Sequence, residues 1–103
     1  IMKVTKELCP VESFTEMLGG KWKLLIINTI RKKGIVRFGQ LATSIPNISR
    51  KVLTDQLKSL QRDNLISRKQ YQQIPPKVEY SLTKKTDGLC SVFKTIEDWV
   101  NKS

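Results

Sequence analysis

One predicted helix of this chain carries basic and polar side chains along one side, at a spacing that suits the binding of a polyanion. Between Ser49 and Asn64 the apolar residues recur at helical spacing and share one face. The opposite face carries cationic, hydroxyl, carboxylate and amide groups: Arg50, Lys51, Thr54, Asp55, Lys58, Gln61 and Arg62. The cationic, hydroxyl and amide groups among them donate hydrogen bonds to phosphate oxygens and base edges. The stretch therefore predicts a DNA recognition helix, with an ordinary solvated helix face as the alternative.

Both ends of this helix are marked in the sequence. Pro46 and Asn47 interrupt the chain before it, and Ser49 is a residue type that caps helix N-termini. Asn64 stands where the chain must leave the helix, and asparagine tolerates the left-handed conformation there. We expect the helix to lie between Ser49 and Asn64, with Ser49 available as a phosphate ligand as well as a cap.

The charge of the chain suits a polyanionic partner. Nineteen Lys and Arg stand against nine Asp and Glu among 103 residues, so the formal net charge is +10. The excess lies in the middle, because residues 17–85 hold fifteen basic and three acidic side chains. A chain of this length predicts one domain with a single modest core. The predicted recognition helix thus lies in the basic part of that domain.

Several kinds of site are excluded by composition. The chain has no histidine, and its two cysteines, Cys9 and Cys90, lack the spacing of a zinc site or a disulfide framework. We find no glycine-rich phosphate loop and no base beside a nucleophile, so we expect no enzyme, metal or cofactor. The N-terminus lacks an apolar secretory segment, and the longest apolar run, Leu24–Ile27, is far short of a membrane span. We therefore expect a cytoplasmic protein with no membrane partner.

Three helices are predicted before the recognition helix. Thr5–Leu18 has apolar residues at helical spacing and is stopped by two glycines. Trp22–Arg31 is apolar around most of its circumference, so we expect neighbours to bury it at the centre of the core. After a short extended piece at Ile35-Val36, Arg37–Ser44 is a short helix that a tight turn joins to the recognition helix. The pair predicts a helix-turn-helix at about 37–64.

A β-hairpin is predicted after the recognition helix, because the sequence there changes to the alternation typical of strands. Leu65–Gln72 and Val78–Thr83 are the two strands, and two prolines between them prevent the tip from pairing as sheet. A hairpin in this place forms a wing, at about 65–83, whose tip lies along the DNA backbone or in the minor groove. Its positive charge comes from Arg68, Lys69 and Lys77. The alternative role for these three is to discourage strand pairing at a sheet edge.

A last helix is predicted from Lys84 to Asn101, with an apolar stripe wider than a small domain needs to cover itself. The first predicted helix also has an apolar stripe, and both terminal segments are nearly neutral. We therefore expect these helices, at about 5–18 and 84–101, to form a homodimer interface. The interface residues would be Leu8, Val11, Phe14, Leu89, Val92, Phe93, Ile96 and Trp99. The alternative is that both helices fold back on the core of their own chain.

Several motifs occur in order from Cys9 to Trp99, over nearly the whole chain. They are Cys9-Pro-Val-Glu12, Leu18-Gly-Gly-Lys-Trp22, Arg37-Phe38-Gly-Gln-Leu41, Ile48-Ser49, Lys51-Val-Leu-Thr54, Leu65-Ile66-Ser-Arg68, Pro75-Pro76-Lys-Val-Glu-Tyr-Ser-Leu-Thr83 and Trp99. In this combination the chain resembles the HxlR-type transcriptional regulators, bacterial winged-helix proteins related to the MarR group. The resemblance implies a homodimeric, cytoplasmic DNA-binding regulator that docks the second helix of its helix-turn-helix in the major groove. It also implies repression as the commoner outcome of binding.

Two positions depart from the family pattern. Asn64 stands where the family commonly has glycine, and the tolerance of asparagine for the left-handed conformation accounts for it. Thr86 stands where the family commonly has a glycine near the start of the last helix, and Gly88 comes two residues later. This departure leaves the exact start of the last helix open, while the predicted fold is unchanged.

Cys9 coincides with a cysteine that recurs in this family and that senses oxidants or electrophiles in several members. A thiol in the first turn of a helix feels the positive end of the helix dipole, which favours thiolate. Glu7 and Glu12 act in the other direction, and the alternative for Cys9 is a small buried residue of the dimer interface. We expect Cys90 to pack in the core. A disulfide from Cys9 to Cys90 or to a second subunit is left open.

The sequence therefore predicts a mostly α protein with a small β-hairpin wing, a single winged helix-turn-helix domain over residues 1–103. We expect a dimeric, sequence-specific DNA-binding transcriptional regulator, a repressor, with an unknown reactive inducer sensed at Cys9 as a further hypothesis. The expected DNA-binding residues are Arg37, Ser49, Arg50, Lys51, Thr54, Lys58, Arg68, Lys69 and Lys77. Asp55 is expected either to accept from a cytosine amino group or to order a neighbouring cation. The alternative function is a winged-helix module that binds proteins without a sequence-specific DNA site.

Overall fold

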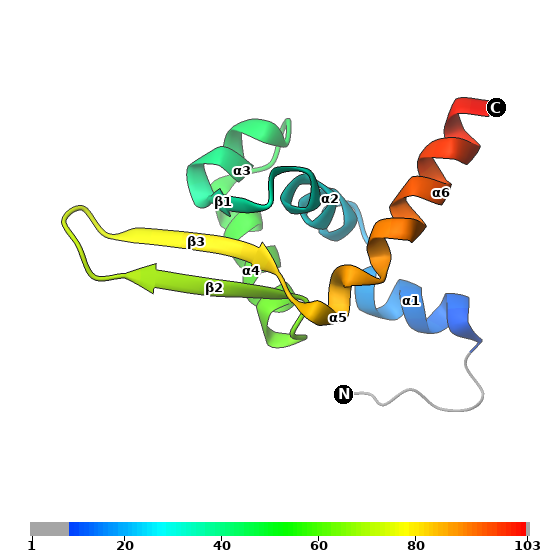
Figure 1. The fold of residues 1–103 in the computed structure, drawn as a ribbon, viewed down its shortest axis with the longest axis horizontal. Coiled ribbons are helices and arrows are strands. Elements are labelled where there is room, and N and C mark those ends of the chain that lie inside the picture. Colours follow the sequence, from blue (N-terminus) through cyan, green and yellow to red (C-terminus); the bar gives the residue numbers. More distant parts are fainter. Residues whose placement is uncertain (1–8, 103) are drawn as a thin grey trace.

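The structure, a computed structural model, describes residues 9–102 and consists of helices around a small antiparallel sheet (Figure 1). A long hairpin extends from one end of the molecule, and the first and last helices lie at the other end. In chain order the elements are α1 (Pro10–Leu18), α2 (Lys23–Lys33), β1 (Ile35–Arg37), α3 (Phe38–Ser44), α4 (Arg50–Arg62), β2 (Ile66–Tyr71), β3 (Lys77–Leu82), α5 (Lys84–Asp87) and α6 (Leu89–Lys102). The predicted helix-turn-helix and wing are thus both present.

The core lies between α2, α4 and the sheet. Ile26, Ile27 and Ile30 of α2 are fully buried, which confirms that this helix forms the centre of the core. The leucines of α4, among them Leu53 and Leu57, pack into the same core from the other side. Burying a side chain of this size stabilises the folded chain by about 1.5–3 kcal/mol. The apolar face of α4 is therefore committed to the core, and its polar face is left open.

The sheet has three strands in the order β1-β3-β2, all antiparallel to their neighbours. The β2–β3 hairpin confirms the predicted wing. The third strand was not expected, because Ile35-Val36 was predicted only as a short extended piece. Val36 pairs with Tyr80 of β3, and both side chains are buried. Because β1 leads directly into α3, this pairing fastens the helix-turn-helix to the base of the wing.

The first helix begins later than predicted. Pro10 is its first residue and Cys9 its N-cap, since proline suits the first helical turn, where no backbone N–H bond is lost. The predicted positions 5–8 of this helix lie outside the described residues. The helix ends at Leu18, as predicted.

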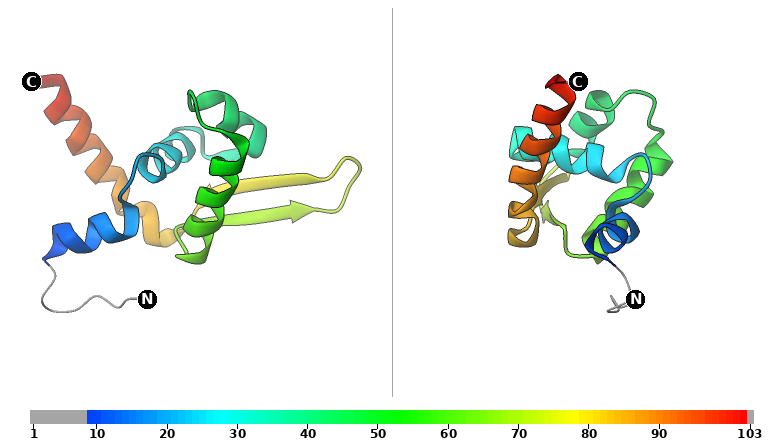
Figure 2. Two further views of the ribbon diagram at one scale, coloured as in Figure 1. Left: turned by 180° about the vertical axis from the view of Figure 1, so that it is seen from behind. Right: turned by 90° about the vertical axis from the view of Figure 1, so that its right-hand side faces the viewer.

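The last helix is divided at Gly88, which corrects the prediction of one continuous helix. The short helix α5 is held against the start of β2, because the buried Thr86 hydroxyl donates to the carbonyl of Leu65 at 3.0 Å and to that of Thr83 at 2.8 Å. Figure 2 shows α6 leaving the body at an angle to α5. The side chain of Thr86 thus attaches α5 to the start of the wing.

The chain leaves α4 through a left-handed residue, as predicted. Asn64 has φ of 62°, and its carbonyl accepts from the Thr83 hydroxyl at 2.8 Å, which joins the end of α4 to the end of the wing. Asn47, in the turn between α3 and α4, also has positive φ, 68°.

We expect Asn64→Ala to lower the free energy of unfolding by about 1 kcal/mol, because alanine resists the left-handed conformation that asparagine and glycine adopt more readily. Asn64→Gly should lose less than Asn64→Ala, and Asn101→Ala in α6 is the matched control. Chemical denaturation of the three variants measures these differences. Equal stability of the alanine and glycine variants would contradict the explanation.

Candidate nucleic-acid interface

The N-terminus of α4 is built as the sequence predicts. The Ser49 hydroxyl accepts from the backbone N–H of Val52 at 3.0 Å and so caps the helix. A serine in this role lies at the positive end of the helix, where backbone N–H groups also bind phosphate. The capping role of Ser49 is therefore confirmed, and its role as a phosphate ligand stays a prediction.

Two cations in the first turn of α4 are held by neighbours. The Arg50 guanidinium lies 4.7 Å from the centre of the Phe38 ring, at the start of α3. The Lys51 ammonium is 2.9 Å from a carboxylate oxygen of Asp55, one turn further along. Asp55 thus orders a neighbouring cation, the second of the two roles expected for it. Arg50 is oriented from α3 and Lys51 from within α4.

The open face of α4 continues onto the wing. Thr54, Lys58 and Gln61 line a hollow of about 310 Å³ together with Arg68 from β2. Leu57 and Tyr80 also line it. Four of the six lining residues carry polar or cationic side chains from two different elements. The helical position of Gln61 predicts its place on this face, although Gln61 is not among the expected DNA contacts.

The other predicted wing cations lie on the opposite face of the hairpin. Lys69 directly follows Arg68 in β2, and successive residues of a strand point to opposite faces. Lys69 is paired in register with Glu79, and so is Arg37 of β1 from the other side. Lys77 lies on this face as well, opposite Tyr71. The structure therefore divides the predicted contacts into an α4 surface that includes Arg68, and an outer wing face that carries Arg37, Lys69 and Lys77.

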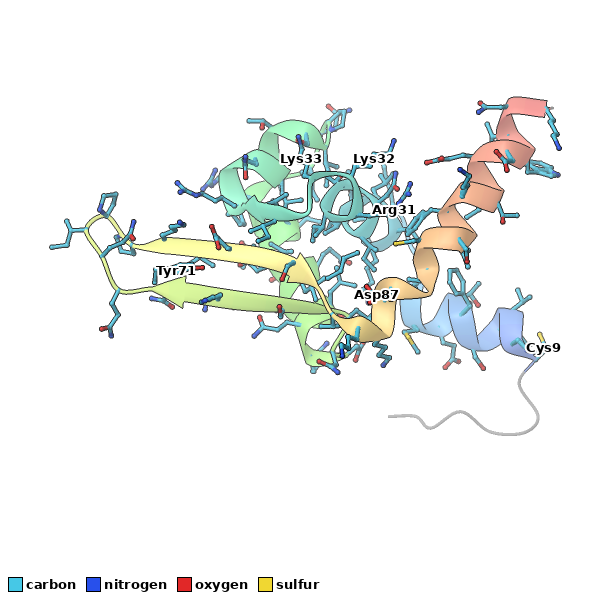
Figure 3. All side chains as sticks on the ribbon, in the orientation of Figure 1. Cys9, Arg31, Lys32, Lys33, Tyr71 and Asp87 are labelled. Atoms are coloured by element: carbon cyan, nitrogen blue, oxygen red, sulfur yellow. The ribbon has the colours of Figure 1, made fainter. Side chains whose placement is uncertain are left out.

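Tyr71 holds the outer wing face together, and sequence reasoning missed it. Its ring lies 4.9 Å from the Lys69 ammonium and 4.7 Å from that of Lys77. Its hydroxyl donates to one carboxylate oxygen of Glu79 at 2.9 Å, and Lys77 lies 3.3 Å from the other. Figure 3 shows Tyr71 near the far end of the hairpin. Its position two residues after Lys69 was the signal that could have identified it.

These contacts lower the pKa of Glu79 below its ordinary value. The hydrogen bond from Tyr71 is the largest cause, partial burial opposes it, and Lys77 and Arg37 contribute further lowering. Since the folded pKa is depressed, ionised Glu79 stabilises the folded wing at neutral pH. This contribution is lost as the pH falls through the lowered pKa.

We expect Tyr71→Phe to raise the pKa of Glu79 toward its ordinary value, because the ring stays and the O–H donor is removed. Tyr80→Phe, on the opposite face of β3, is the control and should leave that pKa unchanged. Carbon-13 NMR of the Glu79 carboxyl group across the acid range measures both. An unaltered Glu79 titration in the Tyr71 variant would show that the hydrogen bond is not the main cause.

The predicted interface residues of the terminal helices differ in exposure. Phe14 and Leu89 are half-buried against the core, and Phe93 is a core residue of its own chain, only 7 % exposed. The members of the predicted set that are exposed are Val11 at 69 %, Val92 at 40 %, Ile96 at 44 % and Trp99 at 71 %. Leu8 lies outside the described residues. Part of the predicted interface set therefore packs against the core of its own chain, and the other part is exposed.

The direction of α6 is fixed by α2. The Arg31 guanidinium pairs with Glu97 of α6 at 2.8 Å and lies 5.1 Å from the Phe93 ring. It also donates to the Asn28 side-chain oxygen at 3.0 and 2.8 Å, so its position is set from both helices. Figure 3 places Arg31 on the side of α2 that faces α6. The long apolar face of α6 is therefore held at a defined angle to the core.

Cys9 caps α1 reciprocally with Glu12. The backbone N–H of Glu12 donates to the Cys9 sulfur at 3.4 Å, and the Cys9 N–H donates to the Glu12 carboxylate at 3.0 Å. The thiol is exposed at the free end of the helix (Figure 3). The expectation that Cys90 packs in the core was wrong, because Cys90 is exposed too. Since α6 leaves the body after Gly88, Leu89 and Phe93 reach the core while Cys90 does not.

Among residues 9–102 no cluster of His, Cys, Asp or Glu could hold a metal ion. Within the same range, no helix has the length and apolar character needed to cross a membrane.

The fold and this polar surface define a winged helix-turn-helix protein. Residues 17–103 match the family model for the HxlR-like helix-turn-helix, and the chain belongs to that family. It is 44 % identical over 94 residues to the MalR protein of Fusobacterium mortiferum, covering 91 % of this chain and 89 % of that protein.

Two solved structures show the same fold. A MarR-family protein from Porphyromonas gingivalis W83 is 39 % identical, with a TM-score of 0.85 and 99 % of each chain covered. The redox regulator HypR in its oxidized form is 36 % identical, with a TM-score of 0.83 over 92 % of this chain and 97 % of that one. The chain is therefore a DNA-binding transcriptional regulator, as its family is.

Proposed function

We propose that the protein is a cytoplasmic, homodimeric repressor that binds a specific operator through α4. The observation that carries the proposal is the continuity of the open face of α4 with Arg68 of the wing, in a single hollow. A helix of this width fits the major groove, where side chains reach base edges. Arg50 and Thr54 are the proposed base contacts, and Ser49, Lys51 and Lys58 the proposed phosphate contacts. A bound regulator of this kind prevents transcription by occupying promoter DNA.

The wing is proposed to contact the phosphate backbone from both of its faces. Arg68 lies on the face toward α4, whereas Arg37, Lys69 and Lys77 lie on the outer face. The tip, residues 72–76, contains no charged residue. A hairpin with cations on both faces and a neutral tip suits the space between two phosphate strands, as in the minor groove.

The homodimer is proposed to form through the exposed side chains of α1 and α6. Val11, Val92, Ile96 and Trp99 form apolar surface at the end of the molecule away from the wing. Exposed apolar side chains that gather in one region commonly mark a surface that a partner buries. Two copies related by a two-fold axis would present two α4 helices to successive turns of the major groove, about 34 Å apart.

We expect Lys58→Ala to weaken binding to all DNA sequences alike and to lower the slope of log affinity against log salt by about one, because it removes a phosphate contact. Arg50→Ala should instead cost about 1–3 kcal/mol on the operator and reduce discrimination against other sequences. Lys102→Ala, at the end of α6, is the charge-matched control. Fluorescence anisotropy over a salt series measures all three.

Full operator preference in Arg50→Ala would remove Arg50 from base recognition. An unchanged salt slope in Lys58→Ala would remove Lys58 from phosphate contact. If the wild type and every variant bound all duplexes equally tightly, the alternative function, a winged-helix module that binds proteins, would be favoured.

We further propose that oxidation of Cys9 releases the DNA. Two observations support this: the thiol is exposed at the N-terminus of α1, and the similar protein HypR is a redox regulator by name. In the proposed step two thiols form one disulfide, and their two electrons and two protons pass to the oxidant. The second thiol is that of Cys90 or of a second copy of the chain.

We expect diamide, which is reduced to its hydrazine as the disulfide forms, to weaken operator binding by the wild type at least tenfold. Cys9→Ser should keep its affinity under the same treatment, and dithiothreitol should restore the wild type. Gel-shift titration measures this, and non-reducing mass spectrometry with Cys90→Ser identifies the second sulfur. A Cys9→Ser variant that still releases DNA on oxidation would refute the role of Cys9.

A further inference from the structure

The tip of the wing ends in apolar residues. Ile74 is completely exposed, at 100 %, and the next most exposed large apolar side chain among residues 9–102 is Trp99, at 71 %. Pro75 and Pro76 follow Ile74 and are exposed as well, at the end of the hairpin that is farthest from α1 and α6 (Figure 1). Because Ile74 is remote from the core, its side chain is free to contact a partner.

The residues around Ile74 suit insertion into an apolar space. Proline has no backbone N–H and a fixed φ, so insertion of this tip desolvates two fewer donors and orders a backbone that is already restricted. Gln72 and Gln73 precede Ile74 and carry no charge. Glutamine amides bind base edges in the minor groove, and isoleucine and proline are among the side chains that enter between bases there. The tip thus combines an apolar wedge with polar groups suited to that groove.

The hairpin is held together directly behind the tip. Tyr71 and Lys77 are the last pair of the β2–β3 ladder. The Tyr71 ring lies against the ammonium groups of Lys69 and Lys77, and its hydroxyl donates to Glu79 on the other strand. Both strands are therefore fixed where they meet the tip, and two cations lie behind Ile74 where the phosphates beside an inserted residue would be.

The length of the hairpin matches the distance between neighbouring grooves of DNA. Arg68 lines the α4 surface, and Tyr71 follows it along β2 by three residues, which is about 10 Å at about 3.3 Å per residue. Ile74 is three residues further out and adds at most about 10 Å. The centres of adjacent major and minor grooves are half a turn apart, about 17 Å along the axis. With α4 in the major groove, the tip therefore reaches the next minor groove.

We propose that Ile74 inserts between two base pairs from the minor groove and kinks the DNA at that step. The inference rests on the proposed binding of DNA by α4. Apolar side chains that act in this way unstack the step and bend the duplex toward the major groove by about 20–90°. Pyrimidine–purine steps such as TA unstack most easily, whereas A-tracts are stiff. Ile74 therefore selects sequence through the free energy needed to deform the step, without a hydrogen bond to a base.

The position of the selected step follows from the proposed dimer. The helices α1 and α6 lie at the opposite end of the molecule from the tip, so the two wings point away from the dimer axis (Figure 1). Half a turn of DNA is about 5 base pairs. We therefore expect a TA or CA step on the outer flank of each half-site, about 5 base pairs from its centre.

The first experiment measures unstacking directly. The probe is the duplex most enriched from a random pool by binding to the full chain, with 2-aminopurine in place of one flanking adenine at a time. The fluorescence of this base rises when it is unstacked, and we expect a several-fold rise at the inserted step only. Ile74→Ala should bind the same duplex without the rise. Ile35→Ala, which shortens an exposed isoleucine of β1, is the matched control and should keep it.

A second experiment measures the selection of the step. Anisotropy titrations compare duplexes that carry TA or AA at the position found by fluorescence. The wild type and Ile74→Leu should prefer TA several-fold, because both carry a large apolar side chain, whereas Ile74→Ala should bind the two duplexes alike. The melting temperature of the free protein should be the same for all three, since the side chain of Ile74 is completely exposed.

Three outcomes would contradict the inference. Specific binding without a fluorescence rise at any flanking position would overturn the insertion alone, as when the tip contacts only sugar and phosphate or a partner protein. A preference for TA that persists in Ile74→Ala would overturn the role of Ile74. Absence of specific DNA binding by the wild type would overturn the proposed function and the insertion with it.

Discussion

Burial of one face of α4 is the constraint on which the rest of the structure depends. Leu53, Leu57 and Leu60 are all within 2 % of complete burial, and together they fix the rotation of the helix about its axis. Rotation away from this position would expose those leucines and bury cations, both of which are unfavourable. The polar side of α4 therefore faces outward because the other side is required by the core. The same packing brings α4 beside β2 and hence brings Arg68 to the recognition surface.

The sheet connects this surface to the remaining parts. Its central strand, β3, pairs with β1 at the entry to the helix-turn-helix and with β2 in the wing. Alternation along the strands then divides the wing cations between two faces. On the outer face an acidic residue, Glu79, accepts a hydrogen bond from Tyr71 and pairs with Lys77. It orders the cations around it, and its own charge lowers the net positive charge of that face by one. On the far side of the core, Arg31 and Phe93 fix the angle of α6, which in the proposed dimer sets the distance between the two recognition helices.

Local patterns predicted most of the fold. The Ser49 cap, the left-handed Asn64 and the leucine spacing of α4 are properties of neighbouring residues, and each was found as expected. The strand pairing of Ile35–Arg37 was not predicted, because three residues give too short a pattern and their partner lies more than forty positions away. The break at Gly88 and the exposure of Cys90 depend on how α5 and α6 pack against the rest of the chain, as in the tertiary contact of Thr86 with Leu65, and local patterns do not contain that information. For the site, the residue types were predictable, and so were the opposite faces of the adjacent residues Arg68 and Lys69. Placing Lys77 and Arg37 on the face of Lys69 required the register of the sheet.

In the proposed dimer, two copies of α4 bind a specific DNA sequence together. Selection of binding sites from a pool of random duplexes, followed by sequencing, tests it directly, because the pool contains every candidate operator of the required length. We expect enrichment of an inverted repeat whose half-sites are centred about 10 base pairs apart, one turn of the double helix, or a whole multiple of that spacing. Enrichment of a single asymmetric site would contradict the two-fold arrangement, and a pool that stays random would contradict sequence-specific binding itself.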